Sequence, residues 1–437
     1  MSPLALRPVA PHRAASRRAL LAGSAGNLVE WYEFGVYGCF ATVIATHFFT
    51  PPAGTAGGTP ALIATYASFA LAFFFRPVGA LLFGRLGDRL GRRPVLVLVV
   101  GLMTLATTAI GLLPTRAVIG PAAPWLLTLL RVVQGLSAGG EFGGAVSLMT
   151  ESAPPGRRGL YGAWQSFTVA LGLLAGAATA ATVARVLPGA ALQAWGWRIP
   201  FLLALPLGGV ALWLRTALEE PPPASASASA PVPAGAAPPG EGPVRAVALA
   251  IARVTGWSAA GYAFLVVLPS YLQSTAGSST SEALTATALA NLGFAACVLP
   301  AGLLSDRIGR RPVMFGGALA VVLLAFPLLH ALRDPGLSPA ARAGPLLVAG
   351  ALVGLMAGPG PAMLAEMFPR RSRCTGLGLA YSLANAVFSG CAGLVITALI
   401  AATGDASVPA WYAAAACAVS ALALATLRGD GHREPLR

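Results

Sequence analysis

The sequence predicts an all-α integral membrane protein in which twelve transmembrane helices form two similar six-helix bundles. Of its 437 residues, 56% are hydrophobic and 10% are charged, whereas soluble domains carry about a quarter charged residues. In addition, GRLGDRLGRRP at 84–94 returns 218 residues later as GLLSDRIGRRP at 302–312, identical at 8 of 11 positions. A fixed-offset repeat between apolar runs is typical of a transporter built from two related bundles.

Twelve apolar stretches are long enough to cross a bilayer, six on each side of a polar break. They lie at 20–48, 61–84, 94–114, 124–149, 160–184, 197–216, 244–273, 283–304, 312–332, 344–365, 374–401 and 409–427. We therefore divide the chain into a cytoplasmic tail, an N-terminal bundle, a cytoplasmic linker rich in Pro, Ala and Ser, a C-terminal bundle and a second cytoplasmic tail. These parts are residues 1–18, 19–216, 217–243, 244–427 and 428–437.

All 29 basic residues are arginine, and the net charge is +14. Most of them follow alternate predicted helices, so the positive-inside rule places both termini in the cytoplasm. The charge is therefore a signal of topology, and we expect no nucleic-acid partner. Because the chain lacks lysine, it has neither a Walker A loop nor a Schiff-base amine. Transport must then draw on an ion gradient or on the gradient of the solute.

The five cysteines and four histidines are scattered, with no spacing typical of a disulfide or a metal site. The sequence also offers no nucleophile–base pair. We therefore expect no metal, no cofactor and no enzyme activity. The partners that we expect are a small-molecule substrate, protons and the lipid bilayer, with the protein a monomer in the plasma or inner membrane.

Ionisable side chains inside the predicted spans concentrate in the first half, at Glu30, Glu33, Arg76, Arg131 and Glu141. Each costs about 2.5–3.5 kcal/mol at the bilayer midplane on insertion scales, so such residues usually mark a transport pathway. We assign Glu30, Glu33 and Glu141 to proton coupling, with Arg131 tuning a carboxylate or binding an anion. The alternative is that these charges form structural ion pairs that orient the helices.

Four polar residues of the first span share one helical face, because they are spaced by three, three and four residues. They are Asn27, Glu30, Glu33 and Tyr37. Glu30, Arg76 and Glu141 each lie roughly 14 Å from the cytoplasmic ends of their helices, at about 1.5 Å per residue. We expect these three to meet around one polar cavity. Arg76 is then either paired with a carboxylate or free to hold an anionic substrate.

Polar and aromatic side chains of several spans are candidates for binding the substrate. They are Asn27, Tyr37, Arg76, Gln134, Trp164, Gln165, Tyr262, Tyr381 and Asn385. Membrane helices also use such residues for packing and as interface anchors, which is the alternative role for each of them.

The repeated charged loops predict a cytoplasmic gate. An aspartate after the second and eighth spans can face the N-terminus of a helix, and the arginines that follow can reach Glu151 and Glu366. Such ion pairs would close the cytoplasmic side in one state and break in another; the alternative is positive-inside anchoring. The predicted gate residues are Asp88, Arg89, Arg92, Glu151, Arg158, Asp306, Arg307, Arg310, Glu366 and Arg373.

GRLGDRLGRRP resembles the signature loop of the major facilitator superfamily, and RVVQGLSAGG resembles its fourth-helix motif. With GNLVEWYEFGVYG, FFFRPVGALLFGRLGD, QGLSAGGEFGG, WGWRIPF and LPSYL, they are similar to the metabolite:proton symporter branch of that superfamily. The resemblance covers nearly the whole chain outside the tails and linker. It implies twelve helices, rocker-switch alternating access and proton-coupled uptake. It also places Asn27, Glu30, Tyr37, Arg76 and Glu141 at positions typical of the branch.

Two details bear on function within that branch. Glu33 stands where relatives usually have aspartate, so the acid is kept and is one methylene longer. GLGLAYSLANAVFSG at 376–390 looks more like the organic-acid permeases than the betaine carriers. We expect a symporter that imports a small organic acid of the α-ketoglutarate or citrate class, or a zwitterion such as proline or glycine betaine. The alternatives are a proton-coupled exporter of an amphipathic compound and a passive uniporter.

Overall fold

A computed structural model describes residues 13–51, 58–90, 92–139, 141–217, 243–334, 336–369 and 373–427. Every regular element among these residues is a helix. Most of the predicted tails and linker lie outside the described residues. So do the side chains of three predicted site residues, Asp88, Arg92 and Glu141, although the backbone of each is described as helical.

The helices of the first half join end to end into six membrane-length stretches, in which η1 and η2 are π-helical turns. They are α1 (Arg13–Cys39), α2 (Ala41–Ile44), η1 (Ala45–Phe49), α3 (Gly58–Leu90), α4 (Arg92–Leu112), α5 (Arg116–Ile119), α6 (Ala122–Ala138), α7 (Glu141–Glu151), α8 (Arg158–Val186), α9 (Gly189–Ala191), η2 (Leu192–Gly196), α10 (Arg198–Leu202) and α11 (Ala204–Ala217).

The second half is built in the same way, with a π-helical turn inside its fifth stretch. Its helices are α12 (Pro243–Leu265), α13 (Leu268–Ser274), α14 (Thr280–Ile308), α15 (Arg310–Arg333), α16 (Pro339–Ala357), α17 (Gly360–Met367), α18 (Arg373–Ala384), η4 (Asn385–Gly390), α19 (Ala392–Thr403) and α20 (Val408–Ala425).

Nine stretches among the described residues have both the length and the hydropathy of a membrane span, and α12 with α13, bent by 48°, supplies a tenth. The remaining two predicted spans correspond to α1 and to α6 with α7. These two stretches carry Glu30, Glu33 and Arg131. Helix α1 is less apolar than the other long helices, whereas α6 is as apolar as its neighbours and, at 17 residues, is short for a span on its own.

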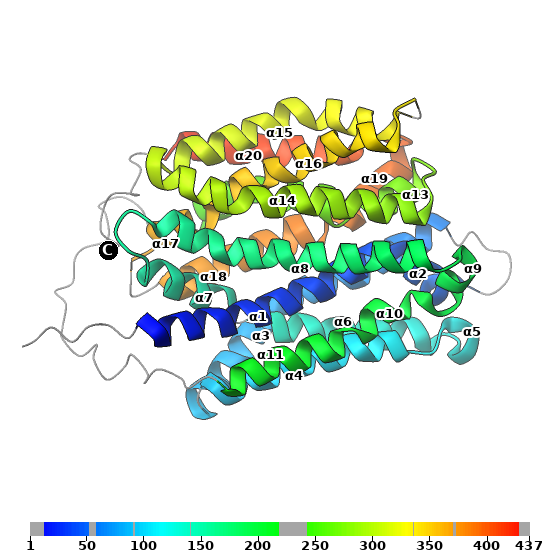
Figure 1. Ribbon diagram of the computed structural model, residues 1–437, viewed down its shortest axis with the longest axis horizontal. Helices are drawn as coiled ribbons and strands as arrows, with labels where there is room; N and C mark the ends of the chain where they lie inside the picture. The colour runs from blue at the N-terminus through cyan, green and yellow to red at the C-terminus, as the bar shows by residue number, and fades with distance from the viewer. Residues whose placement is uncertain are drawn as a thin grey trace, which may run out of the picture.

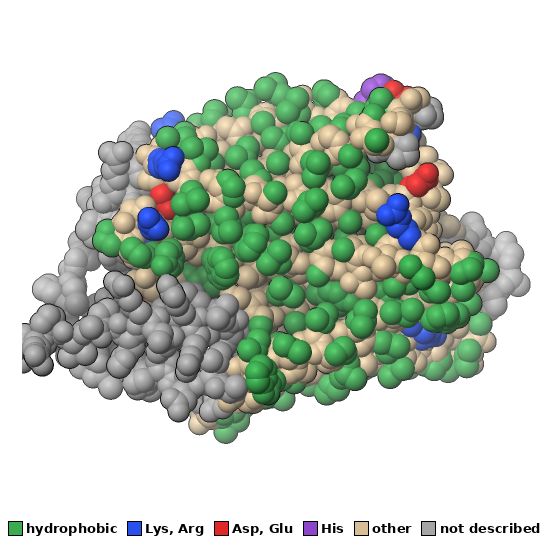
Figure 2. Space-filling view, in the orientation of Figure 1, with side chains coloured by type: hydrophobic (Ala, Val, Ile, Leu, Met, Phe, Trp, Pro, Cys, Tyr) green, Lys and Arg blue, Asp and Glu red, His purple; other side chains and the backbone are tan. Residues whose placement is uncertain are grey.

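The two halves lie side by side, and their helices run along the long axis of the molecule (Figure 1). Most of the first half, coloured blue to green, lies below the second half, coloured yellow-green to red, although α18 lies beside α7, and α8 packs against α14 where the halves meet. Helix α1 begins and α20 ends on the left of the picture. On the face in Figure 2, hydrophobic side chains cover the middle, and charged side chains show only toward the two ends. This belt fits a bilayer whose normal follows the long axis.

Close contact between α3 and α6 depends on glycine. A side chain at Gly135 would overlap the backbone carbonyl of Ala72, and one at Gly79 would overlap that of Leu136. Small residues let membrane helices approach to backbone contact. The approach holds Arg76 of α3 and Arg131 of α6 against the same part of α1.

Candidate functional site

Glu30 and Arg76 form a buried ion pair inside the first half. The Arg76 Nη2 atom lies 2.9 Å from Glu30 Oε1, and the two side chains are 5% and 10% exposed, respectively. The Arg76 guanidinium also lies over three aromatic rings, 5.6 Å from Trp31, 4.8 Å from Phe34 and 4.4 Å from Phe73. Attraction to the carboxylate and to the ring faces together offsets the cost of burying the two charges.

Glu33, one turn further along α1, is connected to Arg131 only through intervening residues. Thr107 of α4 donates a hydrogen bond to Glu33 Oε2 at 2.6 Å, and Gln134 Nε2 donates to Thr107 Oγ1 at 2.5 Å. Arg131 Nη1 then donates to Gln134 Oε1 at 2.6 Å. Glu33 Oε1 and the Nε and Nη2 atoms of Arg131 are buried without a hydrogen-bond partner. Glu33 and Arg131 therefore share a hydrogen-bond network without forming an ion pair.

The ring of Phe34 lies between the two buried arginines. Its centroid is 4.8 Å from the guanidinium carbon of Arg76 and 4.9 Å from that of Arg131. Arg131 also lies over the rings of Tyr37 and Phe69, at 4.2 and 4.7 Å. One aromatic side chain of α1 thus separates two like charges that α3 and α6 bring together.

A cavity of about 30 Å³ lies between the two halves. Eleven of the fifteen residues that line it come from the second half, and the others are Trp31, Ser166, Val169 and Leu173. None of these fifteen residues carries a charge. A volume of this size holds about one or two water molecules. The cavity must therefore widen before an organic solute can enter.

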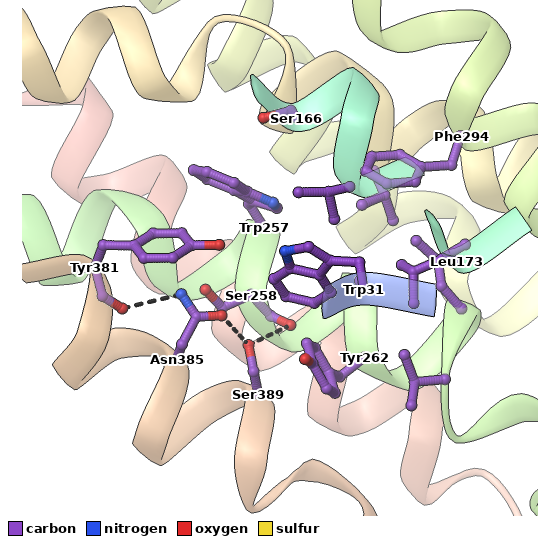
Figure 3. A pocket seen from close by; sticks show the side chains of 15 residues that line it. Trp31, Ser166, Leu173, Trp257, Ser258, Tyr262, Phe294, Tyr381, Asn385 and Ser389 are labelled. Carbon is purple, nitrogen blue, oxygen red and sulfur yellow. Dashed lines mark hydrogen bonds between the residues drawn. The ribbon is translucent and has the colours of Figure 1, made fainter. Parts of the chain in front are cut away.

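Neutral hydrogen-bonding groups and aromatic rings face this cavity (Figure 3). The hydroxyl oxygens of Tyr262 and Ser258 are buried without a hydrogen-bond partner. The indole nitrogens of Trp31 and Trp257, one from each half, point toward the space between their rings in Figure 3. The Tyr262 ring packs edge-on against Trp31, with the centroids 6.3 Å apart. The wall can donate hydrogen bonds and present ring faces to a ligand.

The structure separates the predicted substrate-binding residues into two groups. Tyr262, Tyr381 and Asn385 line the cavity, where Asn385 accepts a hydrogen bond from Ser389 at 2.9 Å. Arg76, Gln134 and Tyr37 belong to the charged cluster behind Trp31 and Phe34.

The other three predicted residues do not line the cavity. Asn27 donates to Thr168 Oγ1 at 2.5 Å and to the carbonyl of Gln165 at 3.3 Å. Gln165 is buried, and Trp164 is 36% exposed and donates to Ser24 at 2.9 Å. The cavity instead uses residues outside the predicted set, chiefly Trp31, Trp257 and three serines. Of these residues, only Trp31 could have been singled out from the sequence, because it directly follows the predicted site residue Glu30.

Among the described residues, two ion pairs join the halves at one end, which we call the arginine-rich end. Arg373 of α18 lies 2.6 Å from Glu151 of α7, and Arg158 of α8 lies 3.4 Å from Glu366 of α17. Arg373 lies 215 residues after Arg158, and Glu366 lies 215 residues after Glu151. The two pairs are therefore the same contact repeated across the duplication.

Asp306 reinforces this end from the second half. It accepts hydrogen bonds from the backbone N–H groups of Gly159 and Leu160, at 2.7 and 2.9 Å, and so faces the N-terminus of α8. Arg310 lies 2.8 Å from Asp306 and 3.1 Å from Glu366. The side chains of Arg89 and Arg307 are exposed at helix ends. The predicted gate residues Asp88 and Arg92 cannot be placed, since their side chains lie outside those described.

Neutral contacts join the halves at the opposite end. The Tyr66 hydroxyl of α3 lies 2.5 Å from Ser270 Oγ of α13, and Thr42 donates to Gln273 Oε1 at 3.1 Å. Contacts between the halves are therefore present at both ends of the molecule.

Comparison with known proteins agrees with this architecture. The family model described as "Sugar (and other) transporter" matches residues 19–223, and the one described as "Major Facilitator Superfamily" matches residues 246–437. A crystal structure of a D-xylose-proton symporter superposes with a TM-score of 0.76 at 19% identity, covering 95% of this chain and 98% of the other. The predicted twelve-helix fold is confirmed by this likeness.

Three curated relatives extend over most of the chain. It is 37% identical to the alpha-ketoglutarate permease of Escherichia coli, covering 87% of each protein. It is 35% identical to the ectoine/proline transporter ProP of Corynebacterium glutamicum, covering 93% of this chain and 83% of that one. It is 32% identical to the citrate-proton symporter of Salmonella typhi, covering 96% of each. The chain is therefore a multi-pass membrane protein that belongs to the major facilitator superfamily, in its metabolite:proton symporter family.

Proposed function

We propose that this protein is a proton-coupled symporter that takes up a small carboxylate-bearing solute, an organic acid or a zwitterion, by alternating access. The observation that carries the proposal is the presence of buried acids on α1 close to a cavity between the halves. Relatives of this chain are named for proline, ectoine, α-ketoglutarate and citrate. All of these solutes carry a carboxylate.

Glu33 is the better of the two α1 acids for carrying the proton. Glu30 is held in an ion pair with Arg76, so protonating it would leave a buried cation without its carboxylate. Glu33 has one oxygen without a hydrogen-bond partner and faces no direct ion pair. It can gain or lose a proton while Thr107 keeps its hydrogen bond. In this proposal Glu30 orients Arg76, and Arg131 acts on Glu33 through Gln134 and Thr107.

Glu141 and the paired residues of the arginine-rich end keep the roles assigned to them. Glu141 stays a candidate for proton coupling, and the ion pairs of the arginine-rich end form the cytoplasmic gate. When Arg373 leaves Glu151 and Arg158 leaves Glu366, the halves can part at that end. The neutral contacts around Tyr66 and Ser270 form the gate on the opposite side. A monomer is sufficient, because the cavity lies within one chain.

The test is uptake by the purified protein in liposomes under an imposed pH gradient, acid outside. The labelled panel contains α-ketoglutarate, citrate, shikimate, proline and glycine betaine. We expect at least one of them to accumulate above equilibrium, and a protonophore to abolish the accumulation. Uptake that reaches equilibrium and ignores the protonophore would mean a uniporter. Extrusion of a compound loaded inside, driven by protons that enter under the same gradient, would mean an exporter. Either result overturns the proposal.

A further inference from the structure

The wall of the central cavity is neutral, although buried charges lie just behind it. None of the fifteen lining residues is charged. Arg76 is paired with Glu30 and covered by the rings of Trp31, Phe34 and Phe73. The charges nearest the cavity are thus balanced and shielded before any solute enters. A ligand with a large net charge would bring charge that nothing on the wall neutralises.

The same wall holds hydrogen-bond donors suited to a single carboxylate. Tyr262 and Ser258 are 5% and 4% exposed, and their hydroxyl oxygens have no partner. The indole nitrogens of Trp31 and Trp257 point into the space between the two rings (Figure 3). Buried polar groups in folded proteins are normally paired, so two orphan hydroxyls on a cavity wall indicate groups that a ligand completes. Hydroxyl and indole groups can all donate to carboxylate oxygens.

Aromatic rings make up much of the remaining surface. Trp31, Trp257, Tyr262 and Tyr381 all line the cavity, with Trp257 and Tyr381 packed 5.8 Å apart. Ring faces attract cations, and clusters of such faces recognise quaternary ammonium groups in proteins. They offer nothing to a second carboxylate. The wall therefore combines a place for one carboxylate with a place for one organic cation.

We propose that the substrate is a small zwitterion with one carboxylate and one cationic nitrogen, of the betaine or cyclic imino acid type, rather than a di- or tricarboxylate. This inference rests on the proposed function and deepens it. The small cavity supports the same choice, because a compact zwitterion requires less widening than citrate. The resemblance of residues 376–390 to organic-acid permeases favours the other class, whereas the residues of that segment that line the cavity, Tyr381, Asn385 and Ser389, are neutral.

A binding measurement tests this inference separately from proton coupling, because binding needs no pH gradient. Titrations of the purified wild-type protein would compare glycine betaine with tert-butylacetate, its carbon isostere, in which a quaternary carbon replaces the nitrogen. α-Ketoglutarate and citrate complete the series. We expect glycine betaine or proline to bind, and glycine betaine to bind about tenfold tighter than the isostere, a difference of about 1.4 kcal/mol. Equal affinity for the isostere, or tighter binding of α-ketoglutarate or citrate, would overturn the proposal.

A variant pair locates the effect. Trp257→Leu should remove most of the preference for glycine betaine over tert-butylacetate, and Trp257→Phe should retain part of it because a ring remains. Trp213→Leu is the matched control, since Trp213 is 65% exposed on α11, away from the cavity. If Trp257→Leu fails to fold, the wild-type titrations still decide. Zwitterion binding without protonophore-sensitive uptake would contradict the symport proposal and leave the zwitterion proposal intact. Dicarboxylate uptake that the protonophore abolishes would sink the zwitterion proposal alone.

Discussion

The two halves of this protein share a fold and a repeated loop, but they differ in what they bury. The first half holds Glu30, Glu33, Arg76 and Arg131 deep among its helices. The second half supplies most of the cavity wall, and that wall is neutral. Duplication gave two similar scaffolds, and in the proposed mechanism the first handles the proton while the second supplies most of the wall that binds the solute. Coupling must then pass through contacts between the halves.

Tyr262 is the side chain best placed to transmit that coupling. It lines the cavity from α12 and packs edge-on against Phe69 and Phe73 of the first half, at 6.1 and 5.6 Å. Those rings in turn lie under the guanidinium groups of Arg131 and Arg76. The contacts between the halves also differ in chemistry, since they include ion pairs at the arginine-rich end and are hydrogen bonds between neutral groups at the opposite end. Four substitutions test these contrasts.

The largest effect should come from breaking the buried ion pair. Glu30→Gln removes the carboxylate that pairs with Arg76, and breaking such a buried pair costs about 3–5 kcal/mol. We expect a large fall in thermal stability, measured by unfolding of the purified protein in detergent. The double variant Glu30→Gln/Arg76→Gln should recover much of the loss, because no buried charge is left alone. Arg307→Ala, at an exposed site, should change stability by at most about 0.5 kcal/mol.

A double variant less stable than Glu30→Gln would contradict this explanation of the buried ion pair. Glu30 and Arg76 would then contribute by packing separately, and charge balance would not explain their burial. In the second half, by contrast, Ser389→Ala removes a hydroxyl from the neutral cavity wall. It should lower the free energy of unfolding by only about 1 kcal/mol, the value of one hydrogen bond.

The next effect concerns transport rather than stability. Glu33→Gln keeps the size of the side chain and can still accept the hydrogen bond from Thr107, but it cannot exchange a proton. We expect uphill accumulation to disappear while counterflow exchange of the substrate continues. Glu282→Gln, an exposed glutamate at the start of α14, is the matched control and should accumulate substrate normally. Protonophore-sensitive accumulation by Glu33→Gln would show that the proton is carried elsewhere, with Glu30 and Glu141 as the remaining acids.

Sequence patterns could predict the first half of this contrast better than the second. Charged residues in apolar spans stand out, and their spacing and depth were enough to bring Glu30 to Arg76, one of the two outcomes expected for that arginine. The link from Glu33 to Arg131 was not predictable, because it depends on Thr107, one of many threonines in membrane helices. The cavity wall was harder still. Trp257 and Ser258 lie on a helix that also carries Arg253 and Thr255, so only the packing of both halves determines which of its polar and aromatic side chains meet the cavity.

A smaller effect should follow from loosening the arginine-rich end. Glu151→Gln weakens the pair with Arg373, in which Glu151 is already 34% exposed, so we expect a cost of about 1 kcal/mol. Cys374 follows Arg373, and its thiol lies 3.2 Å from Ser147 of the other half, which makes it a native reporter of separation. Its labelling by a maleimide should become faster in Glu151→Gln and should also rise with salt in the wild type. Cys374→Ser identifies the labelled site, and an unchanged rate would remove Glu151 from the gate.

The smallest effect is expected at the opposite end, where the contact is a neutral hydrogen bond. Tyr66→Phe keeps the ring and removes the hydroxyl that meets Ser270, and because Ser270 still donates to the Val267 carbonyl, the cost should be about 0.5 kcal/mol. Ser270→Ala should cost a similar amount, and the two losses should not add, because each removes the same bond. Thermal stability of the two single variants and the double variant measures this coupling. It should be insensitive to ionic strength, since salt screens charges and not neutral hydrogen bonds. A coupling as dependent on salt as that of Glu151 with Arg373 would mean that the two ends do not differ in the way their chemistry indicates, and that charge elsewhere controls both.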